Sequence, residues 1–186
     1  MRFAFASAVF IALMPFSAGA DEISDALDSA KAAYADGDIQ YAIEELDFAR
    51  QRLAALNTDA LGAFLPAAPS GWTREVDTEM GAGLAMMGGG AGAEATYYNP
   101  NDGSQYTVTL IADNPMIAGI SGMIGQAALM GMKVERVGRQ KFMVQDNEMT
   151  GLIANRIMVK IAGADVDTMK SVLEGMDFRA IGNFGN

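Results

Sequence analysis

The chain of 186 residues contains no cysteine and no histidine. These two absences exclude thiol nucleophiles, disulfides, Cys/His zinc sites, iron–sulfur clusters and any catalytic triad that depends on a histidine. Basic residues are also scarce, because 13 Lys and Arg stand against 23 Asp and Glu, for a formal net charge of −10. An acidic chain is repelled by a phosphate backbone, so the composition argues against general nucleic-acid binding.

Hydrophobic residues make up 51% of the chain and charged residues only 19%. A chain of this length and hydropathy can bury a core and is not disordered. No nucleophile stands in a recognisable pattern with a base, and the acidic pairs lie where helix starts and solvation explain them. We therefore expect neither enzymatic activity nor a cofactor.

The N-terminus has the pattern of a secretory signal peptide. Met1 and Arg2 form a short basic region, and the uncharged apolar run 3–16 follows it. Ala18 and Ala20 then supply the small residues that signal peptidase requires. The apolar run is shorter than the roughly 20 residues that a membrane span needs. The sequence predicts cleavage after Ala20 and export of residues 21–186 to the periplasm.

Residues 21–57 show helical periodicity in two successive segments. Gly37 suits the left-handed C-cap of the first helix, and Asp38 can cap the second. Neither helix is long enough to be stable alone, so the two are predicted to pair as an αα-hairpin. Apolar and small residues recur in each segment, namely Ile23, Ala26, Leu27, Ala30, Ala33 and Tyr34, and then Ile43, Leu46, Ala49, Leu53 and Leu56.

The small and aromatic residues between positions 30 and 54 resemble a single tetratricopeptide repeat. The positions that carry the resemblance are Ala30, Tyr34, Gly37, Ala42 and Ala49. One repeat cannot bury a continuous core, and the sequence shows no second copy. The resemblance therefore implies a helical hairpin, without the peptide-binding groove of a repeat array.

The remainder of the chain reads as a linker and a mixed domain. Prolines in residues 58–71 predict an extended linker, and residues 72–182 form the domain. Its predicted strands are 72–77, 94–98, 105–112, 133–137, 139–145 and 148–161, with helices at 115–131 and 165–176. The expected class is α+β: an N-terminal αα-hairpin, then a mainly antiparallel sheet in the order β-ββ-α-βββ-α with helices packed on one face.

This order of elements, with Gly71-Trp72 opening the first strand, resembles that of the PsbP-like periplasmic and lumenal domains. The resemblance covers residues 70–180 at the level of the fold. It implies a small binding or assembly role and no catalytic residues.

Residues 80–93 consist of Gly, Ala, Met and Leu without a charge. This density of glycine predicts a mobile apolar loop that lies outside the core. Thioethers are soft ligands that suit Cu(I), so Met80, Met86 and Met87 form an alternative metal site. The same three side chains can instead present an adaptable contact surface.

The predicted helix 115–131 has two faces that differ in character. Met116, Met123 and Met130 share a stripe with isoleucines and are predicted to pack on the sheet. The opposite face carries Ala118, Gly122 and Gly125, and no charge occurs from Asn114 to Met132. The sequence favours cover by the protein's own hairpin, with a partner protein or a membrane surface as alternatives.

Four basic residues in the last strands are predicted to share the outer face of the sheet. These are Arg139, Lys141, Arg156 and Lys160. An ordinary solvated face would carry the same pattern. The sharper interpretation is a docking face for an anionic partner or ligand.

Together these patterns predict a non-catalytic, exported binding or assembly protein that contacts another envelope protein. The same patterns predict that it neither binds nucleic acid nor spans a membrane. The alternative is a soluble ligand- or Cu(I)-binding module that uses the Met/Gly-rich loop.

Overall fold

The computed structural model describes residues 18–77, 80–127 and 129–185. The chain divides into two compact units, with the boundary between Leu53 and Ala54. We call residues 18–53 the hairpin unit and residues 54–185 the α/β unit. Most of the predicted signal peptide lies outside the described residues, so cleavage after Ala20 stays a prediction.

The hairpin unit contains α1 (Ala18–Asp36) and most of α2 (Ile39–Gly62). Gly37 between them has φ +83°, a left-handed conformation that glycine adopts without strain. The Asp38 carboxylate accepts a hydrogen bond from the Tyr41 amide at 3.1 Å and so caps α2. The helices meet through small buried side chains, which are Ala26, Ala30 and Ala33 of α1 and Ala42 and Ala49 of α2. The predicted αα-hairpin is confirmed.

Helix α2 extends beyond its predicted end at residue 57 and continues to Gly62. The segment 58–71, predicted as an extended linker, therefore begins as helix. Residues 58–65 contain no proline, so nothing in residues 58–62 interrupts the helical hydrogen bonds. Leu61 and Leu65 are buried in the core of the α/β unit, which anchors this segment to the sheet.

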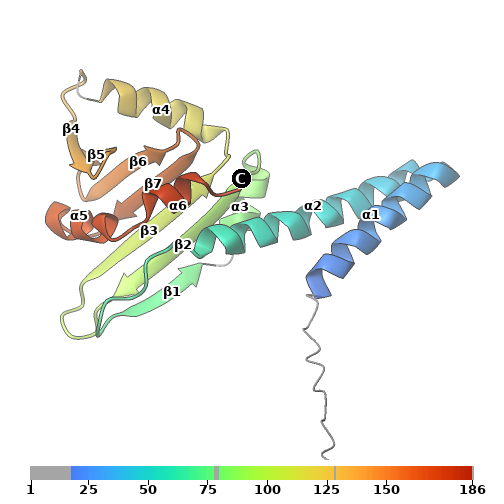
Figure 1. The fold of residues 1–186 in the computed structure, drawn as a ribbon, viewed down its shortest axis with the longest axis horizontal. Coiled ribbons are helices and arrows are strands. Elements are labelled where there is room, and N and C mark those ends of the chain that lie inside the picture. Colours follow the sequence, from blue (N-terminus) through green and yellow to red (C-terminus); the bar gives the residue numbers. More distant parts are fainter. Residues whose placement is uncertain (1–17, 78–79, 128, 186) are drawn as a thin grey trace, which may run out of the picture. The chain divides into compact units, whose positions relative to one another are not determined.

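The α/β unit is built on one antiparallel sheet of seven strands among its described residues, in the order β1-β2-β3-β7-β6-β5-β4 (Figure 1). Its α+β class is as predicted. The strands are β1 (Thr73–Asp77), β2 (Ala91–Tyr98), β3 (Gln105–Ala112), β4 (Lys133–Val137), β5 (Gln140–Gln145), β6 (Glu148–Ile153) and β7 (Ile157–Ala162).

The long strand predicted at 148–161 is wrong, because the segment forms the two strands β6 and β7. Ala154 and Asn155 adopt φ values of +52° and +55° and reverse the chain between them. Leu152 of β6 then lies opposite Met158 of β7 on one face of the sheet. The alternation of apolar residues continues in phase through the turn, so periodicity alone does not reveal the break.

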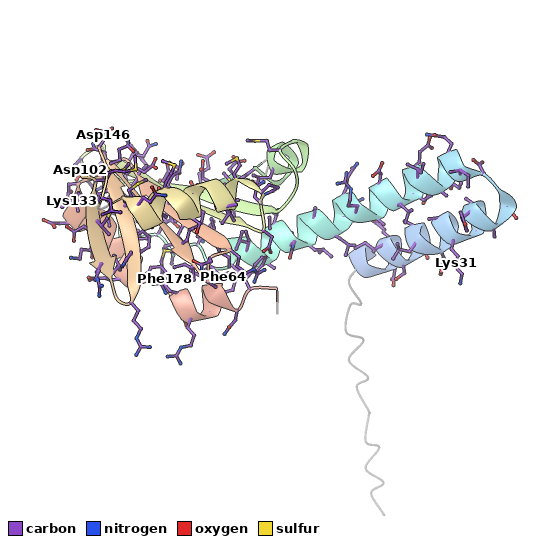
Figure 2. The ribbon with its side chains drawn as sticks, turned by 90° about the horizontal axis from the view of Figure 1, so that it is seen from above. Lys31, Phe64, Asp102, Lys133, Asp146 and Phe178 are labelled. Carbon is purple, nitrogen blue, oxygen red and sulfur yellow. The ribbon has the colours of Figure 1, made fainter. Side chains whose placement is uncertain are left out.

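One face of the sheet carries the main core, and the end of α2 packs on it with α5 (Val166–Glu174) and α6 (Phe178–Gly182). Phe64 and Phe178, labelled in Figure 2, both pack against this core. Helix α6 was not expected from the sequence. Its first turn is capped by the Asp177 carboxylate, which accepts from two backbone amides at 3.0 Å. The largest buried side chains here are Tyr97, Phe142, Leu61, Leu110 and Met149.

The opposite face carries α3 (Met80–Met86) and α4 (Met116–Gln126). The expectation that all helices pack on one face is therefore corrected. Leu84 of α3 packs with Ile111 and Met158, which point away from the main core, and Ile120 of α4 packs against the same cluster. Apolar side chains on both faces of the central strands require cover on both sides.

The glycine-rich segment 80–93, predicted as a loop outside the core, is also corrected. Its first half is α3, and its last residues begin β2. Gly92 of β2 explains the helix, because a Cβ there would collide with the side chains of Leu84 and Met80. Gly88, Gly89 and Gly90 have φ values of +98°, +90° and +102°, so their backbone requires glycine.

Candidate interaction surface

Helix α4 packs on the sheet through its isoleucines rather than its methionines. Ile117 is 5% exposed, and Ile120 packs against the cluster of Leu84, Ile111 and Met158. Met116, Met123 and Met130 are 42%, 47% and 61% exposed, so their predicted core role is wrong. A helix on a sheet buries only the centre of its apolar stripe, and the methionines flank that centre.

The predicted small-residue face of α4 is exposed. Ala118, Gly122 and Gly125 face solvent, and a Cβ at either glycine would meet no atom within 4 Å. Leu129, just beyond the helix, is 89% exposed. Nothing in the α/β unit therefore covers this uncharged helix. We call its exposed residues the α4 surface: Met116, Ala118, Gly122, Met123, Gly125, Leu129 and Met130.

The start of α4 is held by Asn114, which is buried. The Asn114 side-chain oxygen accepts a hydrogen bond from the Met116 amide at 2.9 Å. Its side-chain nitrogen donates to the Gly89 carbonyl at 2.6 Å. The glycine run thus positions the first turn of α4, and a Cβ at Gly90 would clash with the backbone of Ala112 in this arrangement.

The structure places Lys141 and Lys160 on one face of the sheet, but this face carries α3 and α4, whereas the sequence predicted an outer face without helices. Lys160 lies between Thr109 of β3 and Thr150 of β6 in the strand register. Its ammonium is 3.9 Å from the Glu148 carboxylate, and both side chains are partly exposed. Lys160 therefore belongs to a row of polar side chains across the sheet. In the same row the Thr109 hydroxyl donates to the Glu94 carboxylate at 2.6 Å.

Arg156 has a structural role, so the predicted grouping of four docking cations is not observed. Its guanidinium donates to both carboxylate oxygens of Asp113, at 2.9 and 2.6 Å, and to the Phe184 carbonyl at 2.6 Å. The hydrogen bonds to Asp113 raise the pKa of Arg156 above its ordinary value. This contact joins the β6–β7 turn to the end of β3 and to the C-terminal segment.

Arg139 and Lys141 instead group with Arg136, which sequence reasoning missed. Arg136 and Lys141 are directly opposed on β4 and β5, and Arg139 lies in the turn between these strands. None of the three forms an ion pair within the described part of the chain. We call them the basic tip. The signal that could have revealed the basic tip is the turn at Gly138 and Arg139, because a two-residue turn there places Arg136 opposite Lys141.

Two members of the basic tip share a face of the sheet with α4. The side chains of Arg136 and Lys141 belong to the same face of the sheet as Met143 and Leu152, and α4 lies against β5 on that face. Like charges that are directly opposed across two strands repel each other. An uncharged apolar helix and unpaired cations on one face of the sheet together suit an acidic, partly apolar partner.

The described methionines of the alternative copper site lie in different surroundings. Met80 packs over Gly92 against the Leu84 cluster, whereas Met87 is 56% exposed. The side chain of Met86 lies outside the described residues.

Other potential sites carry little chemistry. A polar hollow of about 350 Å³ at the β5–β6 turn is lined by Gln145, Asp146, Asn147, Glu148 and Ala162. In the part of the chain that the structure describes, no three His, Cys, Asp or Glu side chains could hold a metal ion together. No described helix is long and apolar enough to cross a membrane.

Comparison with protein-family models, curated proteins and solved structures finds no match to this chain. The likenesses to a tetratricopeptide repeat and to PsbP-like domains therefore rest only on the residues and the order of elements that suggested them.

Proposed function

We propose that this protein is a non-catalytic, exported binding or assembly protein that acts by contact with another envelope protein. The contact is made by the α4 surface together with the basic tip. The observation that carries the proposal is the stretch from Asn114 to Met132, which has no charge and exposes Met123, Leu129 and Met130 to solvent.

The energetics favour a protein partner at this surface. Burial of apolar area releases roughly 25 cal/mol per Å², and methionine side chains adapt readily to irregular partners. Exposed glycines at positions 122 and 125 allow a partner backbone to approach α4 closely. Arg136, Arg139 and Lys141 add attraction for acidic groups, which speeds association and fixes orientation.

The test is binding to envelope proteins with paired charge variants. The wild-type chain and an Arg139→Glu/Lys141→Glu variant are used to co-purify partners, and each captured protein is then titrated in pure form. We expect the variant to bind at least about tenfold more weakly, which corresponds to about 1.4 kcal/mol. Arg179→Glu, an exposed charge reversal on α6, should leave binding unchanged. Equal binding by all three chains would overturn the proposed surface.

The alternative function, Cu(I) binding by the Met/Gly-rich segment, has a direct test. Titration with Cu(I) under reducing conditions compares the wild-type chain with a Met86→Leu/Met87→Leu variant. Affinity that disappears in the variant would replace the proposed function with the alternative. The same titration of a Met116→Leu/Met123→Leu variant controls for non-specific thioether binding.

A further inference from the structure

Two groups of methionine in the α/β unit differ sharply in exposure. Four side chains are more than 40% exposed, and all of them belong to α4 or to segments beside it: Met87, Met116, Met123 and Met130. Five others are less than 10% exposed: Met143, Met149, Met158, Met169 and Met176. Among the side chains that the structure describes, the accessible thioethers therefore gather at one surface.

Three of the exposed methionines form a row because they recur every seven residues. At about 100° per residue, seven residues amount to two turns less roughly 20°, so Met116, Met123 and Met130 follow one flank of the helix. The spacing holds beyond the end of α4, because the Met130 amide donates to the Gln126 carbonyl at 3.0 Å, as in one further helical turn. We call these three residues the thioether row.

The fourth exposed methionine, Met87, lies near the start of α4. Gly88, the next residue, lies against Pro115, since a Cβ on Gly88 would be 3.1 Å from the proline ring. The Asn114 side chain also donates to the Gly89 carbonyl and holds the glycine run in place. The fold thus brings exposed thioethers together from two segments that are distant in sequence.

Exposed thioethers are the groups of this chain that are most open to attack by a peroxide. A sulfur lone pair attacks one oxygen of hydrogen peroxide, so that the S–O bond forms as the O–O bond breaks. The hydroxide that leaves takes the remaining hydroxyl proton and becomes water. The thioether loses two electrons and becomes a sulfoxide, while the peroxide is reduced. Thiols, which compete for the same oxidant, are absent from the chain.

Oxidation of the thioether row would change the chemistry of the α4 surface and leave the fold intact. A sulfoxide is polar and accepts hydrogen bonds, so its burial in an apolar contact is unfavourable. Exposed side chains keep their contact with water after oxidation, so the folded state loses little. In the core, by contrast, Met149 and Met169 are fully buried, and a sulfoxide there would disrupt the packing.

We propose that the thioether row, together with Met87, is a modification site for hydrogen peroxide. Oxidation there to methionine sulfoxide makes the α4 surface polar and releases its partner. The release rests on the proposed function, whereas the selective oxidation does not. The selectivity comes from the separation of exposed from buried thioethers and from the lack of thiols.

Limited treatment of the purified chain with hydrogen peroxide, followed by peptide mass spectrometry, tests the site. We expect the thioether row and Met87 to gain oxygen at least about tenfold faster than the five buried methionines. Circular dichroism and the thermal midpoint should stay unchanged while only the exposed group is oxidised. Equal rates in the two groups, or unfolding before the exposed group is fully oxidised, would overturn the proposal.

Retention on a phenyl column measures the change in polarity without a partner. Peroxide should shorten the retention of the wild-type chain. It should not do so for a leucine variant in which Met87 and the three residues of the thioether row are replaced, because this chain keeps the apolar surface without its sulfur. Met116→Gln/Met123→Gln/Met130→Gln imitates the sulfoxides and should elute early without peroxide. An equal loss of retention in the wild type and the leucine variant would show that the oxidation acts elsewhere.

A partner captured in the test of the proposed function then reports the release. The oxidised wild-type chain should bind it at least about tenfold more weakly, whereas the leucine variant should bind equally well before and after peroxide. If oxidation leaves binding unchanged while Arg139→Glu/Lys141→Glu weakens it, the proposed function stands and the release is overturned. If the charge variants also bind equally, the proposed function fails and the release fails with it, and the mass spectra alone decide the modification site.

Discussion

At the scale of single residues, the lack of a side chain at glycine determines both packing and backbone conformation in this fold. Gly92 is the second residue of β2, where the absent Cβ makes room for Leu84 and Met80. The space above Gly92 accommodates Leu84, and the burial of Leu84 holds the short helix α3 against the sheet. The glycine content of the segment, which predicted a loop, thus serves close packing at one position and left-handed backbone at three others.

Gly92→Val should displace α3 and lower the free energy of unfolding by about 1–3 kcal/mol, because the added side chain overfills the slot. Gly83→Ala is the matched control in α3 itself, where an added Cβ meets open space. It should raise stability by roughly 0.5–1 kcal/mol through helix propensity. Urea unfolding of the three chains measures both changes, and a neutral Gly92→Val would contradict the packed slot.

Tyr97 links the sheet to the segment after α2, since its hydroxyl donates to the Pro66 carbonyl at 2.6 Å. Burial raises the pKa of Tyr97 to about 12, compared with about 10 in an unfolded chain. Between these values only the unfolded chain loses the phenolic proton. The free energy of unfolding should therefore fall as pH rises through this window, by up to about 1.4 kcal/mol per pH unit.

Tyr97→Phe should flatten this alkaline decline, and urea unfolding at about pH 9, 10 and 11 would show the difference in slope. A residual slope is expected, because burial also raises the pKa of Tyr106. The variant should also lose about 0.5–1.5 kcal/mol at neutral pH with the hydrogen bond to Pro66. Identical slopes in the two chains would show that Tyr97 does not titrate as described.

At the scale of elements, α4 combines a buried isoleucine side with an exposed side that carries no charge. The start of α4 depends on Asn114 and the glycine run. The neighbouring strand β5 contributes Lys141 to the basic tip, and the turn before β5 contributes Arg139. An element with this much uncharged exposed surface is either covered by another body or used for contact.

Gly122→Leu separates a partner surface from internal packing. A Cβ at this position meets nothing within 4 Å, so the substitution should leave the thermal midpoint unchanged or raise it slightly. Binding to a co-purified partner should weaken, since leucine blocks close approach to the helix. A loss of several kcal/mol in stability would instead support the sequence-based prediction that the hairpin of this chain covers α4.

At the scale of the whole molecule, the chain forms two units whose boundary falls within α2. The α/β unit carries the proposed contact surface, which is formed by α4 and the basic tip.

Export of the chain to the periplasm is a prediction that concerns the whole molecule. Mass spectrometry of the protein from the producing cell should show Asp21 as the first residue, because Ala18 and Ala20 precede it. Ala20→Leu, which removes the small residue at the cleavage position, should leave a longer chain that sediments with membranes. A wild-type chain that retains Met1 would contradict the periplasmic localisation.

Local patterns were sufficient for the hairpin and for most strands, because helical and strand periods are properties of neighbouring residues. Tertiary structure decided the rest. The β6–β7 turn was hidden because alternation continues in phase through it, and α3 depends on a slot in a strand that follows it in the chain. Tertiary structure also separated the predicted group of basic residues. Arg156 is held by Asp113 and Phe184, which are distant in sequence, whereas Arg136 joined Arg139 and Lys141 through strand pairing.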